Sequence, residues 1–413
     1  MSEIEEIILW IFGSLAILVF VCSSYLYLKN KRHQYATVDI KTSSSPPIGS
    51  QPETTSKDKR SGVRRAKIQY FVNGTITMPS IQEFALLDEE YGEGTKFLCL
   101  HGSLEKNKQL NLVQDVLPFD YNRVRLLDRS GTTNYINASW IRKLKAKEKL
   151  DCLPSHPYLP PSNVNVIVSQ DPIKETLEDY YVMIFQQNIK LVIQISDTNI
   201  PADKVSNPNI SPPGVSKTFI NHCKITEYLI KESWNVANRE NESKSVIYLR
   251  LKGWPTEQQL SEDMINKILT TIAITRKELG INMRERATIL AHDDQGGISG
   301  AAVFIALYDL LEVIDNEMVS TDSSFKTVKE GSKNLDVFRF VKDLRRKRDK
   351  MINYFDEYQF LFRALVHYAQ NMSYYEKYLP PRNVMNTGVV ENDIETALGS
   401  SRTNVEYVLH HET

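Results

Sequence analysis

The chain has 413 residues, a net charge of −1 at pH 7 and 24% charged residues, which is the composition of an ordinary globular protein. The near-zero net charge argues against nucleic acid as the main partner. Four cysteines at irregular spacing, Cys22, Cys99, Cys152 and Cys223, indicate neither a disulfide framework nor a metal-ligand set.

The first predicted element is a transmembrane helix at about residues 7–28, within an N-terminal segment 1–32. These residues are uncharged and mostly apolar, and at ~1.5 Å per residue they reach ~30 Å, the thickness of the hydrocarbon core. Lys29, Lys31 and Arg32 follow, so the positive-inside rule predicts a single-pass membrane protein whose remaining chain is cytoplasmic. A signal peptide is the alternative, but the acidic start and the long apolar run disfavour it.

Residues 33–79 are predicted to form a flexible linker. The stretch 42–65 contains almost no large apolar side chain, so it cannot bury enough surface to offset the entropy of ordering. Six basic residues lie between Lys57 and Lys67. They indicate either a solvated spacer or a segment that contacts anionic lipid.

A globular domain is predicted over residues 80–376, followed by a polar tail, 377–413. Its first helix begins at Ile81, where Ser80 and Glu83 match a capping box. Apolar strands are expected near 166–172, 190–196 and 246–251. Four tyrosines near or in the tail are either kinase targets or without a signalling role: Tyr374, Tyr375, Tyr378 and Tyr407.

The stretch from Arg286 to Ile314 is the centre of the chain. Residues 288–291 form a short apolar run typical of a buried strand, and residues 301–314 form a longer apolar run without Gly or Pro, which predicts a buried helix. Between them lies a glycine-containing loop, 292–300. A strand, a glycine-containing loop and a helix together predict a cradle of N–H groups for an anion.

Seven sequence blocks follow one another along the chain: Leu117–Val124, Asn134–Ser139, Val166–Pro172, Asp179–Tyr181, Trp254–Pro255, the loop 292–300 and Tyr358–Phe360. In this order they resemble the classical protein tyrosine phosphatases of the receptor-like type. The resemblance covers roughly residues 80–374. It implies an α/β fold, a single domain with a twisted mixed sheet flanked by helices.

The resemblance implies a nucleophilic Cys and a phosphate-clamping Arg in the loop, and both are missing. Aligning on Ser299 and its following glycine puts His292 at the Cys position and Ile298 at the Arg position. Aligning on the family's His instead puts Asp293 and Ser299 there. The first register is preferred because it keeps the following glycine and Gly297 in family positions. In either register the loop lacks a thiolate nucleophile and a bidentate cation.

Other positions that the family uses are also altered. Thr256 replaces the general-acid Asp after Trp-Pro, with Glu257 as a possible substitute, and Asn353 and Glu357 replace the water-positioning glutamines. In the recognition block, Leu112 and Val113 replace an Arg and the Tyr on which the substrate ring stacks, while Asn111 is kept. Asp171 stands where the family has Gly.

We therefore expect a remnant phosphate loop that carries its own anion. Asp293 or Asp294 is predicted to accept hydrogen bonds from the loop N–H groups, Ser299 to cap the following helix, and His292 to be structural without an acidic partner. A plain solvent-facing role for the two aspartates is the alternative. The predicted remnant comprises His292, Asp293, Asp294, Gln295, Gly296, Gly297, Ile298 and Ser299.

The predicted function follows from these losses. We expect no catalysis, no cofactor and no metal, but a membrane-anchored scaffold or decoy for a protein partner, such as a tyrosine-phosphorylated protein, a phosphatase or a kinase. The alternatives are a phosphotyrosine-binding module and a residual phosphatase that uses His292 or Asp293 as nucleophile.

Overall fold

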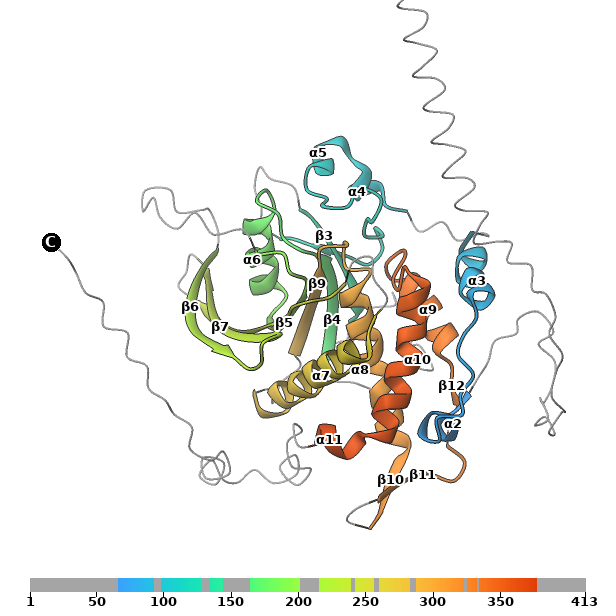
Figure 1. The fold of residues 1–413 in the computed structure, drawn as a ribbon. Coiled ribbons are helices and arrows are strands. Elements are labelled where there is room, and N and C mark those ends of the chain that lie inside the picture. Colours follow the sequence, from blue (N-terminus) through green and yellow to red (C-terminus); the bar gives the residue numbers. More distant parts are fainter. Residues whose placement is uncertain are drawn as a thin grey trace, which may run out of the picture. The chain divides into compact units, whose positions relative to one another are not determined.

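An eight-stranded mixed sheet runs through the domain (Figure 1). The computed structural model describes residues 66–92, 98–127, 134–143, 164–200, 215–238, 242–255, 260–282, 287–322, 325–332 and 334–376. In spatial order the strands are β2 (Arg123–Arg125), β3 (Tyr135–Arg142), β4 (Val164–Gln170), β9 (Ala287–Asp293), β5 (Ile189–Ile195), β8 (Ser243–Leu251), β7 (Leu229–Asn238) and β6 (Val215–Lys224).

The centre of the sheet is parallel and its flanks are antiparallel. β9 lies between β4 and β5 and is parallel to both, and β5 is parallel to β8. The register pairs His292 with Ser169 on one side and with Gln194 on the other. The carboxyl ends of β4, β5 and β9 therefore meet at one edge of the sheet, which is where open α/β sheets bind ligands.

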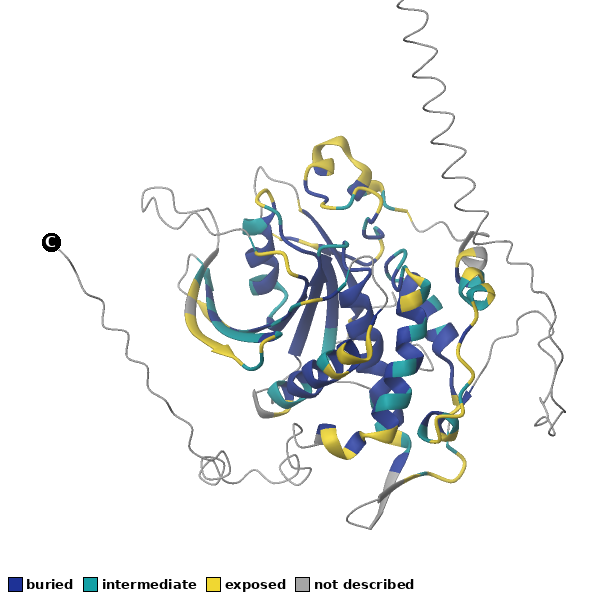
Figure 2. Cartoon of the chain, in the orientation of Figure 1, coloured by how far each residue is buried: buried dark blue, intermediate teal, exposed yellow. Residues whose placement is uncertain are grey.

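Helices cover both faces of the sheet (Figure 1). One hydrophobic core joins the sheet to several helices, among them the four named below, and a second core packs β3, β7 and β8 against another helix on the opposite face. Figure 2 shows that β9 is buried throughout its length, and that β4, β5 and α8 are buried over most of theirs. The four helices are α7 (Glu262–Asn282), α8 (Gly300–Glu317), α9 (Val337–Arg345) and α10 (Phe355–Gln370), and the fifth is α6 (Leu177–Gln186).

Short elements complete the domain. β1 pairs antiparallel with β12, and β10 pairs antiparallel with β11. Ser80 Oγ accepts from the N–H of Glu83 at 3.2 Å, which confirms half of the predicted capping box. The short elements are β1 (Ala66–Lys67), α2 (Ile68–Val72), α3 (Ile81–Gly92), α4 (Leu100–Ser103), α5 (Glu105–Lys108), β10 (Met318–Asp322), β11 (Phe325–Val328), β12 (Asn334–Leu335) and α11 (Met372–Glu376).

The domain begins earlier than predicted. The last part of the predicted linker contains β1 and α2, whose Ile68 and Phe71 are fully buried. These apolar side chains contribute to the main hydrophobic core. The sequence 42–65 before them has almost no large apolar side chain to contribute. The predicted tail, 377–413, and the earlier part of the predicted linker lie outside the described residues.

The predicted α/β fold is confirmed, but the predicted transmembrane helix is corrected. Within the part of the chain that the structure describes, no helix combines the length and the apolar character needed to cross a bilayer. The two longest helices there, α7 and α8, contain several charged residues, among them Glu262, Arg276, Asp309 and Asp315. The segment 7–28 itself lies outside the described residues.

Candidate functional site

The loop from residue 294 to residue 299 joins β9 to α8 at the carboxyl edge of the sheet. Gly296 and Gly297 have φ of 79° and 78°, a conformation that non-glycine residues rarely adopt. A Cβ on Gly297 would lie 2.5 Å from Val168 Cγ1 and 2.6 Å from the carbonyl oxygen of Ser169. The loop is therefore turned tightly against the end of β4, and its N–H groups point inward.

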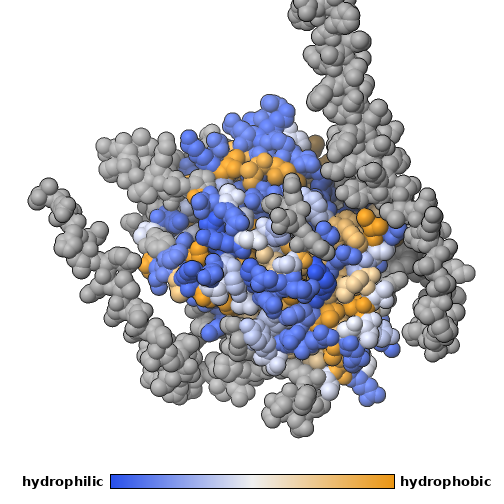
Figure 3. All heavy atoms as spheres, in the orientation of Figure 1, coloured by the Kyte–Doolittle hydropathy of each residue, from blue (hydrophilic) through white to orange (hydrophobic). Residues whose placement is uncertain are grey.

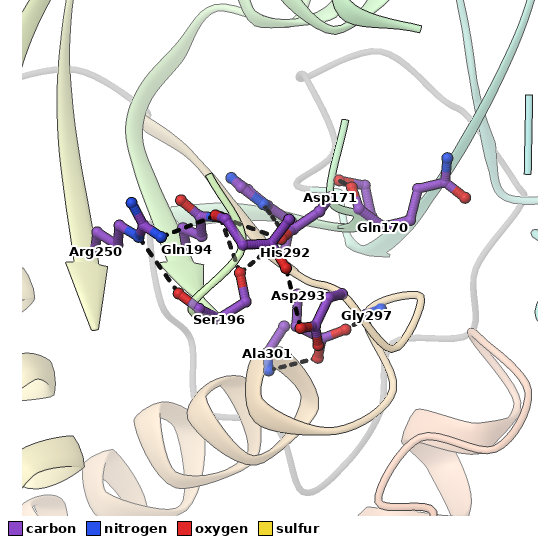
Figure 4. A network of polar contacts seen from close by, with 12 residues as sticks. Gln170, Asp171, Gln194, Ser196, Arg250, His292, Asp293, Gly297 and Ala301 are labelled. Carbon is purple, nitrogen blue, oxygen red and sulfur yellow. Dashed lines mark hydrogen bonds and ion pairs between the residues drawn. The ribbon is translucent and has the colours of Figure 1, made fainter. Parts of the chain in front are cut away.

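The carboxylate of Asp293 fills this ring of N–H groups (Figure 4). Its oxygens accept from the N–H of Gln295 at 3.0 Å, of Gly297 at 2.5 Å, of Ser299 at 3.2 Å and of Ala301 at 2.9 Å. The last donor belongs to the first turn of α8, so the carboxylate also sits at the positive end of that helix. The prediction that an acidic side chain occupies the cradle is confirmed for Asp293.

Burial raises the pKa of Asp293 to about 6, while hydrogen bonds from the N–H of Ala301 and Gly297 act in the opposite direction. The group is therefore mostly ionised at pH 7. Asp294 has a different position, since it is half-buried and accepts from Thr198 Oγ1 at 3.2 Å. Burial also raises the pKa of Asp294.

Ser299 is the N-cap residue of α8, but its hydroxyl does not cap the helix. It accepts from Trp254 Nε1 at 3.0 Å and hydrogen-bonds Glu357 Oε1. The prediction of a side-chain cap is wrong because the hydroxyl is already engaged, and Asp293 serves the first-turn N–H groups instead. The structure thus brings Ser299 and Glu357 together with Trp254, the first residue of the Trp-Pro block.

Glu357 is a buried acid on α10 that approaches the same helix end. Burial raises its pKa to about 8, and the charge of Asp293 acts in the same direction. The group is therefore largely neutral at pH 7, which avoids placing two buried negative charges side by side. Its second oxygen accepts from the N–H of Tyr354 at 3.2 Å, within a capping box at the start of α10.

Arg348 supports the loop from behind, a role that the sequence patterns did not predict. Its side chain is fully buried, and Nε and Nη2 donate to the carbonyl oxygen of Gly296 at 2.9 and 2.6 Å. Nη1 donates to Ser139 at 2.9 Å and Nη2 to Asn137 at 2.6 Å. Burial lowers the pKa of Arg348 to about 10, so it remains a cation and partly balances Asp293.

His292 points away from the loop into a buried polar network (Figure 4). Nδ1 lies 2.5 Å from Asp171 Oδ1, and Nε2 lies 3.0 Å from the hydroxyl of Tyr180. Asp171 also accepts from Ser196 Oγ at 2.6 Å and from Gln194 Nε2 at 3.1 Å. The expectation that His292 has no acidic partner is wrong, because Asp171 supplies one from the end of β4.

Hydrogen bonds keep Asp171 ionised inside the protein. Burial raises its pKa, but bonds from His292, Ser196 and Gln194 outweigh burial, so that the net effect lowers the pKa. The N–H of Asp171 donates to the carbonyl oxygen of Asp293 at 2.7 Å and ties this network to the loop. Since Asp293 and not His292 faces the loop amides, the geometry favours the register that places Asp293 at the nucleophile position.

The predicted recognition block lies next to the loop. Val113 Cβ is 3.6 Å from the point where a Cβ on Gly296 would stand. Asn111 is buried and accepts from Tyr135 at 2.6 Å and Asn137 at 3.0 Å, so it supports the fold. The N–H of Leu112 donates to Gln170 Oε1 at 2.8 Å. At position 113 an isopropyl group offers no aromatic face for a phenyl ring.

Of the other predicted positions, the structure describes Ile298 and Asn353. Ile298 is 5% exposed and belongs to the main core. Asn353, partly buried, immediately follows Ile352, whose N–H donates to the carbonyl oxygen of Ile298 at 2.9 Å. Thr256 and Glu257 lie outside the described residues. Within the described ranges there is no cluster of three metal-ligating side chains.

Comparison with known families agrees with this geometry. The profile described as protein-tyrosine phosphatase matches residues 107–367. Receptor-type tyrosine-protein phosphatase C of Rattus norvegicus is 25% identical over 293 residues, covering 63% of this chain and 20% of the relative. Tyrosine-protein phosphatase 69D of Drosophila melanogaster is 23% identical over 280 residues, covering 66% and 17%. The chain thus spans about a fifth of the length of these relatives.

Solved structures show the same fold. A structure described as PTPN18 in complex with HER2-pY1196 phosphor-peptides matches with a TM-score of 0.52 and 19% identity, covering 69% of this chain and 91% of the other. A second PTPN18 structure, concerned with distinct HER2 tyrosine phosphorylation sites, gives a TM-score of 0.52 and 19% identity over 70% and 92%. At this identity the likeness concerns the fold alone.

Proposed function

Because the chain belongs to the protein-tyrosine phosphatase family, we propose that its domain does not hydrolyse phosphotyrosine and instead binds a protein partner as a scaffold or decoy. The observation that carries the proposal is the Asp293 carboxylate, which accepts four N–H groups of the loop. A phosphoryl group would need those same donors during transfer. The site that would hold the substrate is therefore filled by the protein's own anion.

Electrostatics support this proposal. Two unit negative charges about 4 Å apart repel by about 4 kcal/mol at an effective dielectric near 20. A phosphate entering the loop would meet Asp293, with Asp294 following it, and no Arg lies between residues 287 and 314 to offset the repulsion. The buried Arg348 donates to the Gly296 carbonyl and to two side chains behind the loop, so its donors are already engaged.

The replacement of the family's catalytic groups also supports the proposed absence of hydrolysis. Asp293 replaces a thiolate, Ser299 offers a hydroxyl in place of a guanidinium, and Thr256 offers no proton for a tyrosine leaving group. The carboxylate of Asp293 is held by four N–H groups, so an attack on phosphorus would have to break some of these hydrogen bonds. These losses lie at separate positions, so no single substitution explains them.

A turnover assay tests the absence of catalysis. We expect the purified full chain to release phosphate from p-nitrophenyl phosphate and from a phosphotyrosine peptide no faster than buffer does. Turnover that persists through purification and disappears in both Asp293→Ala and His292→Ala would replace the proposal with a hydrolase that has an unusual nucleophile.

The second candidate is a phosphotyrosine-binding module, which is suggested by the phosphopeptide complex of PTPN18. Calorimetry with a phosphorylated peptide and its plain counterpart separates the two functions. We expect equal, weak heats for both peptides. A large heat with the phosphorylated peptide alone would establish the binding module, and affinity capture from lysates with and without kinase treatment would then show whether partners depend on phosphorylation.

A further inference from the structure

The solvent face of α9 and the turn that follows it carry a cluster of cations. Val337, Phe338, Phe340 and other apolar residues of α9 pack into the core. Lys342 lies on the partly exposed side, and the chain continues into Arg346 and Lys347. The guanidinium of Arg346, 52% exposed, pairs with Asp343 at 3.2 Å. Asp343 also attracts Lys342 and Lys347 electrostatically.

The charge of Arg346 affects the pKa of both lysines. Burial and then the charge of Arg346 lower the pKa of Lys342, while Asp343 opposes them. Burial lowers the pKa of Lys347 as well; there Asp343 opposes the shift and Arg346 adds to it. Lys342, Arg346 and Lys347 each bring a positive charge to this place, so an added anion beside them would be attracted electrostatically.

Side chains from another segment hold the turn in place. The hydroxyl of Tyr121 donates to the carbonyl oxygen of Arg346, and Asn122 Nδ2 donates to the carbonyl oxygen of Lys347 at 2.7 Å. The ring of Tyr121 stacks on Phe119 with centroids 6.0 Å apart, yet 44% of the residue remains exposed. An anchored turn with an exposed Tyr and Arg has the composition of interface hot spots, and its rigidity lowers the entropy cost of binding.

We propose that Tyr121, Lys342, Arg346 and Lys347, here called the basic surface, form a docking site for an acidic segment of a partner protein. The charge is complementary to two or three closely spaced carboxylates. An anionic membrane fits less well, because lipid-binding clusters contain about four to eight cations, and the chain as a whole has a net charge of −1. Figure 3 shows that hydrophilic residues cover much of the face in view, with apolar residues gathered in separate groups.

The basic surface is distinct from the remnant loop. Arg348, one residue beyond Lys347, points inward to Gly296, whereas Arg346 points outward. Binding at the basic surface goes beyond the proposed function, and it would be unaffected if the turnover assay revealed catalysis. Conversely, failure of this inference would leave the account of the Asp293 loop intact.

The test uses the full chain and fluorescein-labelled hexaglutamate, followed by fluorescence anisotropy. We expect binding at roughly 50 mM salt that weakens at roughly 500 mM salt. Combined Arg346→Glu and Lys347→Glu should weaken binding by about tenfold or more, and the matching Gln substitutions by less. The control is Lys174→Glu with Lys224→Glu, which reverses two charges at exposed lysines elsewhere and should bind as the wild type does.

Equal affinity of the two Glu double variants would overturn the proposal, because the peptide would then respond to overall charge and not to the basic surface. Binding to vesicles that contain phosphatidylserine, without binding to hexaglutamate, would also overturn it in favour of a membrane contact. Circular dichroism of each variant shows that any loss is measured on folded protein.

Discussion

Asp171 Oδ1 lies 2.5 Å from His292 Nδ1, inside the protein, and joins the ends of two adjacent parallel strands. The remaining acceptor capacity of Asp171 is used by Ser196 and Gln194. This pair holds the strand end from which the loop begins.

We expect Asp171→Ala to lower the free energy of unfolding by about 3 kcal/mol, because it leaves several buried donors without an acceptor. His292→Ala should also destabilise the protein. In a double-mutant cycle the two substitutions should couple by about 1–3 kcal/mol, as measured by urea unfolding. Additive effects would show that the contact contributes no energy of its own.

A second prediction concerns the internal anion. Asp293→Ala should remove the acceptor of four N–H groups and lower the free energy of unfolding by about 2–4 kcal/mol. The emptied loop should then bind an oxyanion, so that tungstate raises the melting temperature of the variant but not of the wild type. Asp294→Asn, at the half-buried neighbour, is the control and should respond to tungstate as the wild type does. A wild-type crystal with tungstate seated in the loop would contradict this account.

The pH dependence of stability should reveal Glu357. Its carboxyl titrates near 4.5 as a free group and near 8 in the folded protein. Between these values the folded state holds a proton that the unfolded state has lost, so stability falls as pH rises, by up to about 1.4 kcal/mol per pH unit. Glu357→Gln should remove this contribution. The contribution of Glu357 is the difference in the free energy of unfolding between variant and wild type, measured by urea unfolding from about pH 5 to about pH 8. A difference that does not change with pH would refute the prediction.

Arg348 and its exposed neighbour Arg346 form a matched pair for a further test. Arg348→Met should lower the free energy of unfolding by about 3 kcal/mol, because the carbonyl of Gly296 and the amide of Asn137 lose a buried donor. Arg346→Met removes the same charge at the surface and should change stability by no more than about 0.5 kcal/mol. Similar losses at both positions would mean that net charge, and not the loop contact, sets the stability.

Two glycines that share a positive φ allow the cost of backbone strain to be measured apart from the cost of a steric clash. Gly331 has φ of 72°, and no atom lies within 4 Å of the place that an added methyl group would take, so Gly331→Ala should cost only about 1 kcal/mol. At Gly297 the added methyl group would also collide with Val168 and with the backbone of Ser169. Gly297→Ala should therefore cost at least about 2 kcal/mol more. Thermal unfolding of both variants measures the difference.

Local sequence patterns predict individual elements of the fold, while the arrangement of the sheet is implied by the resemblance to a known family. Residues 288–291 and 301–314 predict β9 and α8, because apolar runs of those lengths suit a buried strand and a buried helix. The β6–β7 hairpin was not predicted, since its strands mix polar and apolar residues and gain their pairing from the sheet. Asp293 in the cradle was predictable because a ring of N–H groups requires an acceptor.

The rest of the site depends on contacts between distant segments. Asp171 and His292 are 121 residues apart, and Arg348 reaches Gly296 across 52 residues. Nothing in the local sequence around Arg348 distinguishes this buried cation from Arg346, which faces solvent. The direction of each side chain is fixed only by the packing of α9 and of the turn that follows.

Under the proposed function, the position of Asp293 also bears on how hydrolysis could be gained by substitution. A cysteine codon at 293 would remove the acceptor that organises the loop, while the clamping arginine would still be missing. The first step toward restored hydrolysis would thus produce a less stable protein without activity. Selection for folding alone would therefore oppose that step.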